Sequence, residues 1–304
     1  MKPITKQSNK KPAFTIVELL TVMSIIVILI GLLVPALNKV KRFARDVKQK
    51  AQLHAIDAAI ELFNSEHDGY PPSGAKDEAP PPDNWTARAD YCGAMKLAEA
   101  MVGQDLMGFH PDSAFRSDGT PDGTSASLYP TNPTTLNLNA RRGPYLPLEN
   151  ANAYRLRDLY WEKGMSAKPP YDDKLFVLCD VYNRVTNRST GKKIGMPILY
   201  YRANTANNAH DLADPDNPNN IYNYLDNYEL VALGFPGQLP AAQGGPKHDL
   251  IDPDPKRFYI NTKNDQITDI SRPYRADSYI LISAGWDGEY GTADDICNFD
   301  WKFK

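Results

Sequence analysis

Apolar residues are concentrated near the start of the chain, where Phe14 to Val34 forms a run of 21 residues made mostly of Ile, Leu, Val and Met. As a helix rising 1.5 Å per residue, this run would span about 30 Å, which matches the hydrocarbon core of a bilayer. Glu18 is the one charged residue in it. The pattern predicts a membrane-spanning helix in which the lone carboxylate needs an explanation.

Two simple interpretations account for part of this run. A cleaved signal peptide would have a basic start, an apolar middle and a cut after small residues, here at Val34-Pro35-Ala36. Signal peptides, however, have shorter apolar cores of about 7 to 15 residues. A plain membrane anchor explains the length of the run. It does not explain Glu18, because a lone carboxylate in hydrocarbon costs about 3 kcal/mol.

The helical pattern continues beyond the apolar run, from Asn38 to Glu66. Apolar residues recur there mainly at every third or fourth position, which predicts one apolar stripe and an opposite charged face. The stripe consists of Val40, Phe43, Val47, Leu53, Ile56, Ile60 and Phe63. Pro35 is expected to kink the junction between the two halves. The sequence Asp68-Gly69-Tyr70-Pro71-Pro72 predicts the end of the helix.

The remainder of the chain is polar and rich in turn-forming residues. Residues 71–175 are predicted to be mostly loop, with one short helix at Tyr91–Gln104 and a long loop from Asp112 to Pro147. Short apolar or alternating runs bounded by turn residues predict strands of a small antiparallel sheet. These runs are Lys174–Tyr182, Pro197–Arg202, Tyr228–Leu233 and Ser278–Ser283. With the apolar stripe of the long helix covering one face of that sheet, the predicted fold class is α+β.

Charge and cysteine content narrow the function classes. The 304 residues carry a formal net charge of −3 without a basic stripe across the chain, so no nucleic-acid partner is expected. Residues 1–13 contain four lysines and no acid. Three widely spaced cysteines form no zinc pattern, and in an exported chain they allow one disulfide and one free thiol. They are Cys92, Cys179 and Cys297.

The segment KKPAFTIVELL, residues 10–20, resembles the signal at the start of type IV pilins and type II secretion pseudopilins. In that family a basic leader is cut just before a Phe, the new terminal amine is methylated, and a Glu lies four residues further on. The resemblance implies cleavage between Ala13 and Phe14, methylation of Phe14, and roles in assembly for Glu18 and Pro35. The family usually has Gly where this chain has Ala13.

The resemblance, which extends to residues 276–297, implies a pilin fold built from three parts. These are a cleaved basic leader (1–13), a transmembrane and assembly helix (14–37), and a periplasmic domain (38–304). That domain would comprise an amphipathic helix (38–67), a variable region (71–175) and a C-terminal sheet with an acidic loop (283–300).

The resemblance also implies a function, that of a structural pseudopilin subunit with no enzymatic activity of its own. Such a subunit enters the bacterial inner membrane, is processed by a prepilin peptidase, and polymerises with copies of itself into a periplasmic pseudopilus used in protein transport. Its further partners would be an inner-membrane secretion platform, a cytoplasmic ATPase acting through it, and minor pseudopilins. A type IV pilus subunit and a membrane-anchored periplasmic enzyme or binding protein remain alternatives.

Glu18 gains a physical role from this resemblance. After cleavage, Phe14 would carry an ammonium group, which could pair with Glu18 of a neighbouring subunit. Pairing removes the cost of two isolated charges and would favour helices packed in one register. Alternatively, Glu18 pairs with the terminus of its own chain and aids membrane insertion.

An acidic loop after Ser283 is the best candidate for a metal site. Asp287, Asp294 and Asp295 lie among three glycines at positions 285, 288 and 291. Calcium takes six to eight oxygen ligands in flexible geometry, so these carboxylates together with backbone carbonyls and water suit it. The loop lacks the offsets of an EF-hand, and a solvated acidic turn is the plain alternative. The calcium loop that major pseudopilins carry near the C-terminus favours a structural calcium ion.

Other candidate residues carry weaker signals. The five histidines are scattered without ligand spacing, and Asp211, Asp214 and Asp216 form a short acidic run more typical of a solvated loop. The histidines are His54, His67, His110, His210 and His248. The sequence contains no recognisable nucleophile–base pattern and no phosphate-binding loop.

We predict that mass spectrometry of the mature chain isolated from membranes will find an N-terminal, methylated Phe14. The basic leader, the aromatic residue after Ala13 and the acid four residues later are the features that the resemblance assigns to this processing. A mature chain that begins after Ala36 would contradict the prediction and restore the signal-peptide interpretation.

Overall fold

The computed structural model describes part of the chain, in which two compact units are distinguished, Met1–Ala44 and Arg45–Lys304. The described residues are 15–78, 90–121, 125–160, 175–187, 190–238, 244–301 and 303.

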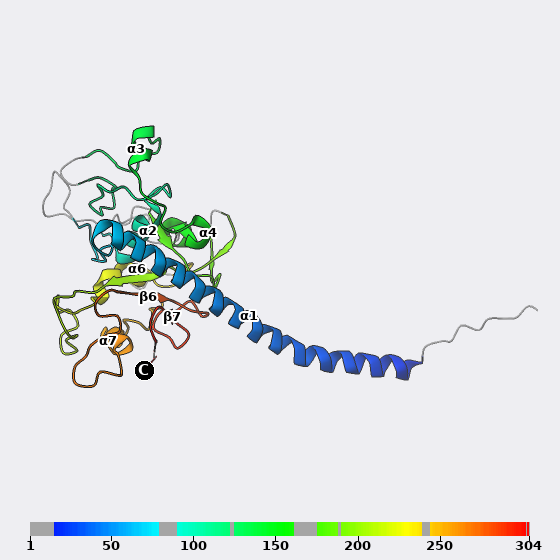
Figure 1. The fold of residues 1–304 in the computed structure, drawn as a ribbon. Coiled ribbons are helices and arrows are strands. Elements are labelled where there is room, and N and C mark those ends of the chain that lie inside the picture. Colours follow the sequence, from blue (N-terminus) through cyan, green and yellow to red (C-terminus); the bar gives the residue numbers. More distant parts are fainter. Residues whose placement is uncertain are drawn as a thin grey trace, which may run out of the picture. The chain divides into compact units, whose positions relative to one another are not determined.

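Helix α1 runs without interruption from Ile16 to His67 (Figure 1). The helix passes through Pro35. The two helical patterns seen in the sequence therefore belong to one element, as predicted. The helix ends where Asp68 takes a positive φ of 53°, followed by Gly69 and the two prolines. A left-handed residue after the last turn is a common way to end a helix.

A three-stranded antiparallel sheet lies at the centre of the second unit. Its strands follow the order β5 (Leu199–Arg202), β6 (Tyr279–Ser283) and β7 (Ile296–Cys297). Tyr200 pairs with Leu281 across β5 and β6. The predicted strands at 197–202 and 278–283 are confirmed, and the sheet is as small as the short runs suggested.

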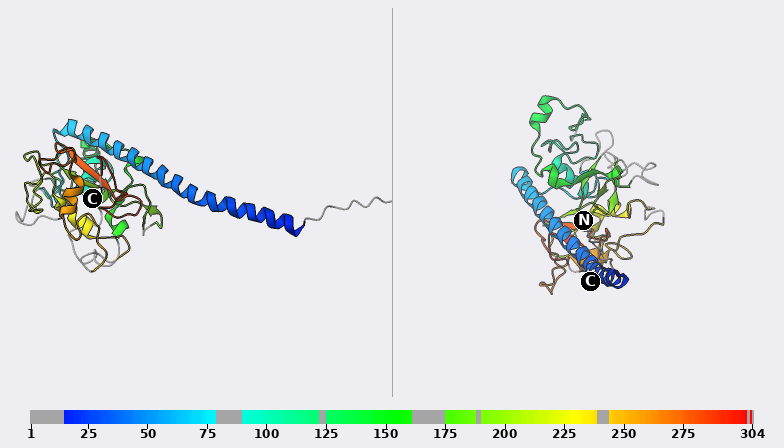
Figure 2. Two further views of the ribbon diagram at one scale, coloured as in Figure 1. Left: turned by 90° about the horizontal axis from the view of Figure 1, so that it is seen from below. Right: turned by 90° about the vertical axis from the view of Figure 1, so that its right-hand side faces the viewer.

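Each face of this sheet is covered, because successive residues of a strand point to opposite sides. On one face, Tyr200, Tyr279 and Leu281 belong to the same core cluster as the second half of α1. The α1 residues in this cluster are Leu53, Ile56, Ala59, Ile60 and Phe63. Figures 1 and 2 show this part of α1, drawn in light blue, running along the sheet.

The opposite face of the sheet packs against the C-terminal helix of the body. Tyr201, Ile280 and Ile282 share a core cluster with Phe258 and Tyr259 of α7 (Lys256–Thr262). The ring centroids of Tyr201 and Phe258 lie 4.8 Å apart. The sheet is therefore the middle layer between two helices.

The start of the predicted apolar stripe does not join this core. Val40, Phe43 and Val47 are 63%, 68% and 50% exposed, whereas Ile56 and Ile60 are completely buried. The prediction that the stripe covers the sheet is therefore right for the last four residues and wrong for Val47, which belongs to the same unit as the sheet but is exposed. The seven positions share a periodicity, but within the second unit burial begins only after Val47.

The remaining elements are short. They are α2 (Gly93–Val102), α3 (Thr135–Ala140), α4 (Leu148–Ala151), α5 (Leu156–Tyr160), η2 (Tyr224–Asn227), α6 (Tyr228–Ala232), and the strand pairs β1–β2 (Ala153–Arg155, Phe176–Leu178) and β3–β4 (Val185–Thr186, Lys193–Ile194). Strand β2 confirms the centre of the predicted 174–182 strand, whose first residue lies outside the described part. Helix α2 confirms the predicted helix at 91–104.

Three predictions differ from the structure. Residues 71–175, which were expected to contain one short helix, contain α3, α4 and α5 in addition to α2. The run Tyr228–Leu233, predicted as a strand, is helical in α6. Leu230 and Val231 are buried there, and a run of this length has too few positions to distinguish the two periods. The predicted long loop at 112–147 contains α3, whose N-cap Thr134 accepts a hydrogen bond from the Asn137 amide at 3.2 Å.

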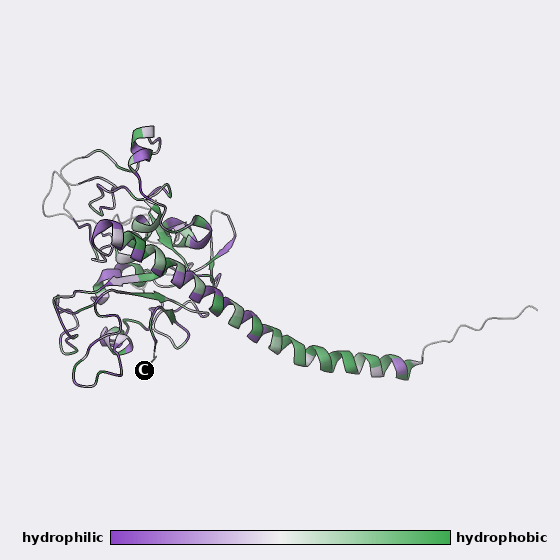
Figure 3. Ribbon diagram, in the orientation of Figure 1, coloured by the Kyte–Doolittle hydropathy of each residue, from purple (hydrophilic) through white to green (hydrophobic). Residues whose placement is uncertain are grey.

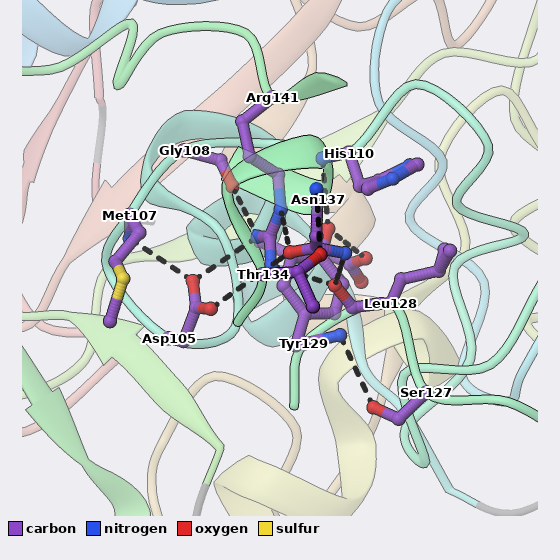
Figure 4. Close-up of polar contacts among 11 residues, drawn as sticks. Asp105, Met107, Gly108, His110, Ser127, Leu128, Tyr129, Thr134, Asn137 and Arg141 are labelled. Atoms are coloured by element: carbon purple, nitrogen blue, oxygen red, sulfur yellow. Dashed lines mark hydrogen bonds and ion pairs between the residues drawn. The ribbon is translucent and has the colours of Figure 1, made fainter. Parts of the chain in front are cut away.

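The buried guanidinium of Arg141 holds the region around α3 together (Figure 4). It donates to the carbonyl oxygens of Gly108 at 3.0 Å and Leu128 at 2.7 Å. It also pairs with Asp105 at 3.1 Å and stacks on Tyr129, with 4.4 Å between Cζ and the ring centroid. Arg141 therefore fixes this segment through hydrogen bonds and an ion pair, whereas α3 itself contributes no buried residue.

A buried carboxylate, Asp180, joins the end of β2 to the end of β6. Its Oδ1 accepts hydrogen bonds from the amides of Tyr182 at 3.1 Å and Met196 at 3.2 Å. Its Oδ2 accepts one from the Ser283 hydroxyl at 3.1 Å. The side chain is fully buried, and this burial raises the pKa of Asp180 to about 7. Asp180 therefore binds a proton in the folded protein under conditions where an unfolded chain would release it.

We predict that ionisation of Asp180 makes the body less stable as the pH rises from about 4 to about 7, with no further change from this group above that range. The difference between a pKa of about 4 in the unfolded chain and about 7 in the folded protein corresponds to at most about 4 kcal/mol. Denaturant unfolding of residues 39–304 across this range will measure the effect. Asp180→Asn should remove this part of the pH dependence, whereas Asp269→Asn, at an exposed site, should retain it. An unchanged slope in Asp180→Asn would contradict the assignment.

Candidate functional site

Thr15 and Glu18 form a reciprocal cap at the start of α1. The Glu18 amide donates to the Thr15 hydroxyl oxygen at 3.2 Å, and the Thr15 amide donates to Glu18 Oε2 at 2.9 Å. The Thr15 hydroxyl also donates to Glu18 Oε2 at 2.7 Å. This arrangement is a capping box, which satisfies amide donors that the first helical turn leaves open.

The capping box gives Glu18 a role within its own chain. A carboxylate at the positive end of a helix is favourable, and the pattern Thr-x-x-Glu was already visible in the sequence at residues 15–18. The cap contacts use Oε2. A carboxylate offers about four lone-pair sites, so the cap leaves capacity for a second donor. Ala13 and Phe14, the predicted cleavage residues, lie outside the described part of the chain.

The first half of α1 exposes its apolar surface all around. Leu20, Ile25, Leu29 and Leu33 are each more than half exposed, and Pro35 lies within the helix. Figure 3 shows most of the ribbon of this half of α1 in green, the colour of hydrophobic residues. The helix is long enough and apolar enough to cross a membrane, and its apolar window is entirely unburied. A membrane anchor and a signal sequence both have this property.

The three predicted metal-binding acids lie in the loop between β6 and β7, around the hydroxyl of Thr292. Its Oγ1 lies 3.0 Å from Asp287 Oδ2, 3.0 Å from Asp294 Oδ1 and 3.5 Å from Asp295 Oδ1. A hydroxyl has one proton and can donate to only one of them at a time. The sequence predicted the acids correctly as neighbours in one loop, but it gave no role to Thr292.

Backbone amides fix the orientation of these carboxylates. Asp294 Oδ2 accepts hydrogen bonds from the amides of Trp286 at 2.6 Å and Asp287 at 3.1 Å. Asp295 Oδ2 accepts one from Gly291 at 2.8 Å. Gly285, with a φ of 63°, brings the backbone so close that a Cβ there would lie 2.2 Å from the Asp294 carbonyl oxygen. The loop therefore requires glycine at position 285.

The carboxyl groups of Asp287 and Asp294 are in hydrogen-bonding contact with each other. Burial and this neighbour raise the pKa of Asp287. Burial acts in the same direction on Asp294, but hydrogen bonds from Asp287, Thr292 and the backbone outweigh it and lower the pKa of Asp294. Burial raises the pKa of Asp295 well above its ordinary value.

The chemistry of the loop fits a hard cation, because its side-chain donors are all oxygens. Among the residues described, no group of three His, Cys, Asp or Glu side chains is already arranged to hold a metal ion. The carboxylates converge on the Thr292 hydroxyl instead of on a common empty point. They fit calcium by type and proximity, and binding would require them to turn away from Thr292.

Trp286 attaches the acidic loop to the second half of α1. The centroid of its ring lies 4.9 Å from Cζ of Arg45 on α1 and 5.5 Å from Cζ of Arg184. Arg45 also donates to the Tyr182 carbonyl oxygen at 3.2 Å, and the Tyr182 hydroxyl donates to Asp46 at 2.8 Å. Sequence analysis missed these contacts, because they join segments more than a hundred residues apart.

The weaker candidates do not form a site within the described residues. His210 and His248 are buried singly, and burial lowers their pKa values to about 3 and about 4. His54 is exposed, and His67 packs on Phe63 with 4.4 Å between ring centroids. His110 is buried, and burial lowers its pKa.

The Asp211–Asp216 run and the cysteines have plain structural explanations. Asp211 Oδ1 accepts hydrogen bonds from the backbone of its own loop, and Asp216 accepts one from the Tyr224 hydroxyl at 2.7 Å. All three cysteines are free thiols, so the disulfide that their number allowed is not formed. Burial raises the pKa of Cys92 to about 11, which makes its thiol unreactive.

Comparisons with known proteins found no relative of this chain. No family model matches the chain, and no curated protein or solved structure matches it. The function of this chain must therefore be inferred from its own sequence pattern and geometry.

Proposed function

We propose that this chain is a structural filament subunit of the pseudopilin kind, held in a membrane by the first half of α1 before it polymerises. The exposed apolar surface of that half is the observation that carries the proposal. Every residue from Ile16 to Ala44 is exposed, and most of the residues from Ile16 to Leu37 are apolar. Water is a poor solvent for such a surface, so a bilayer or the helices of other subunits must cover it.

Glu18 favours a filament subunit over a plain anchor. A plain anchor would keep the same capping box with an uncharged glutamine in place of Glu18, so it gains nothing from the negative charge, whose burial would be unfavourable. In the proposed filament, the ammonium group of a neighbour's processed Phe14 pairs with Glu18 while Thr15 keeps the carboxylate oriented. The capping contacts at 2.7 and 2.9 Å support this arrangement, because they hold the acid at the helix start.

The resemblance of residues 10–20 supports the finer assignment to a type II secretion pseudopilus. The proposed sequence of events is insertion in the bacterial inner membrane, cleavage by a prepilin peptidase, and assembly with minor pseudopilins on a secretion platform. Residues 38–304 would then lie on the periplasmic side. A type IV pilus subunit would share the same helix and differ in the system that assembles it.

A binding protein anchored by α1 is the competing function, and one cavity is its candidate site. This cavity measures about 210 Å³ and lies between α1 and the turn after α4, with Lys48, Gln52 and Glu149 among its lining residues. Gln52 is 7% exposed, and its Oε1 has no hydrogen-bond partner in the structure. The volume is below the roughly 300 Å³ at which small-molecule sites begin, so ordered water suffices to fill it.

We further propose that the acidic loop holds a structural calcium ion through Asp287, Asp294 and Asp295. Bound calcium would supply the positive charge that offsets repulsion among the three carboxylates. Because Trp286 joins this loop to Arg45, an ordered loop would also stabilise the contact with α1. The proximity of the three carboxylates around Thr292 and the all-oxygen set of possible ligands support this proposal.

We predict that Glu18→Gln prevents filament assembly but leaves processing intact. Glutamine can still accept the Thr15 hydrogen bonds in a capping box, so this change removes the charge and keeps the cap. Thr15→Ala is the matched variant, because it removes the cap at a cost of about 1 kcal/mol and keeps the charge. Electron microscopy of filaments, with mass spectrometry of the mature terminus, will measure both. Normal filaments from Glu18→Gln would contradict the charge-pair role.

We predict that calcium raises the melting temperature of residues 39–304. At a free concentration 100-fold above Kd, one site adds about 2.7 kcal/mol to the free energy of unfolding. Asp294→Asn should weaken the stabilisation by calcium, because it removes a negative charge. It keeps one side-chain oxygen that can accept the hydrogen bonds from the backbone amides. Asp211→Asn, in the other acidic run, should leave it unchanged. Identical melting of the wild-type chain with and without calcium would contradict the calcium site.

A further inference from the structure

A second, larger cavity lies in the body, between the loop that follows α1 and the end of β5. It measures about 340 Å³, which is within the range of small-molecule sites. Ser73, Gly74 and Glu78 line it on the loop side, and residues 202–205 line it on the strand side. Neither the proposed filament contacts nor the proposed calcium loop involves these residues.

The buried side chain of Lys96 on α2 holds the loop side of the cavity in place. Its ammonium group donates to the carbonyl oxygens of Gly74 at 2.8 Å and Lys76 at 2.7 Å, and the side chain is completely buried. The same ammonium group pairs with the carboxylate of Glu78. The charge of Glu78 is therefore balanced within the protein, although this residue lines the cavity.

The Ser73 hydroxyl joins the loop side of the cavity to the strand side. Its Oγ accepts a hydrogen bond from the Arg202 amide at 2.9 Å and donates to Asp226 Oδ2 at 2.5 Å. Ser73 is 5% exposed, so these bonds are shielded from water. Both sides of the cavity are therefore fixed by buried polar contacts, as is usual for a binding site formed in advance of its ligand.

Three side-chain donors at the end of β5 are available to a ligand. They belong to Arg202, Asn204 and Thr205, which line the cavity and are exposed. Asn204 uses its Oδ1 to accept a hydrogen bond from the Ala206 amide at 3.2 Å, which leaves its NH₂ group to donate. Within the described part of the chain, the Arg202 guanidinium, the Asn204 NH₂ group and the Thr205 hydroxyl have no hydrogen-bond or ion-pair partner.

The charges around the cavity favour a small anion with a single negative charge. Lys96 balances Glu78, and burial raises the pKa of Asp226 to about 7, so the Asp226 carboxyl is mostly protonated at pH 6. The guanidinium of Arg202 is then the unbalanced charge, and its planar fork suits a carboxylate. A dianion fits less well, because Glu78 would repel its second charge.

We propose that this cavity binds a small monocarboxylate, whose oxygens accept hydrogen bonds from Arg202, with Asn204 and Thr205 as further donors. Pro72 and Ala203, which also line the cavity, provide contacts for a short apolar tail. The proposal does not rest on the proposed function, because every residue in it belongs to the second compact unit. A filament subunit and an anchored binding protein are both compatible with such a site.

Equilibrium dialysis of radiolabelled butyrate against the full-length chain in detergent at pH 6 tests the proposal. Butyrate should bind saturably, whereas its neutral analogue butyramide should not. Arg202→Gln should raise the Kd at least about 10-fold, because it removes hydrogen bonds from a charged donor. Thr205→Val keeps the charge and the approximate size of the side chain, and it should raise the Kd by a smaller factor. The melting temperature of each variant will show whether it is folded.

Arg142→Gln is the matched control, because it makes the same change in net charge at an exposed arginine that does not line the cavity. It should bind butyrate as the wild-type chain does, and an equal loss of affinity in this control would overturn the proposal. An unchanged Kd in folded Arg202→Gln would also overturn it, as would the absence of saturable butyrate binding to the wild-type chain. Sulfate, a dianion at this pH, should compete poorly, and its displacement of butyrate at equal concentration would overturn the assignment to a monocarboxylate.

Discussion

The burial of one stripe of α1 against the β5–β6–β7 sheet is the contact on which the rest of the structure depends. Ile56, Ile60 and Phe63 fill one side of the sheet and leave the opposite side to α7. Along the first half of the same helix, the apolar residues are exposed among the residues that the structure describes. One element therefore has a protein core around one half and needs a different apolar environment around the other.

Buried polar groups complete the body, because a loop-rich chain has few apolar residues with which to fix its loops. Arg141 joins three segments of the region around α3, and Asp180 joins the ends of β2 and β6. Each of these groups has several hydrogen-bond partners, which offset the cost of removing it from water. The acidic loop is different, because its carboxylates face one another, and a proton or a cation must balance them.

Local sequence patterns predicted the elements that local physics controls. The long helix and its end, the strands at β5 and β6, and the helix at α2 all followed from periodicity and turn residues. Helix α6 did not, because an apolar run of a few residues fits a buried strand as well as a helix. Thr15 could have been identified as a cap from its spacing to Glu18, since a capping box is itself a local pattern.

The sequence by itself determined which residues are apolar, where the lone acid lies, and that three carboxylates share one loop. The tertiary structure alone decided that only part of the helix stripe is buried and that the acids meet at Thr292. It also decided that Trp286 lies between Arg45 and Arg184, and that the three thiols stay apart. The physical reason is the distance along the sequence between the residues that interact. Periodicity and capping depend on residues a few positions apart, whereas these contacts depend on how distant segments pack.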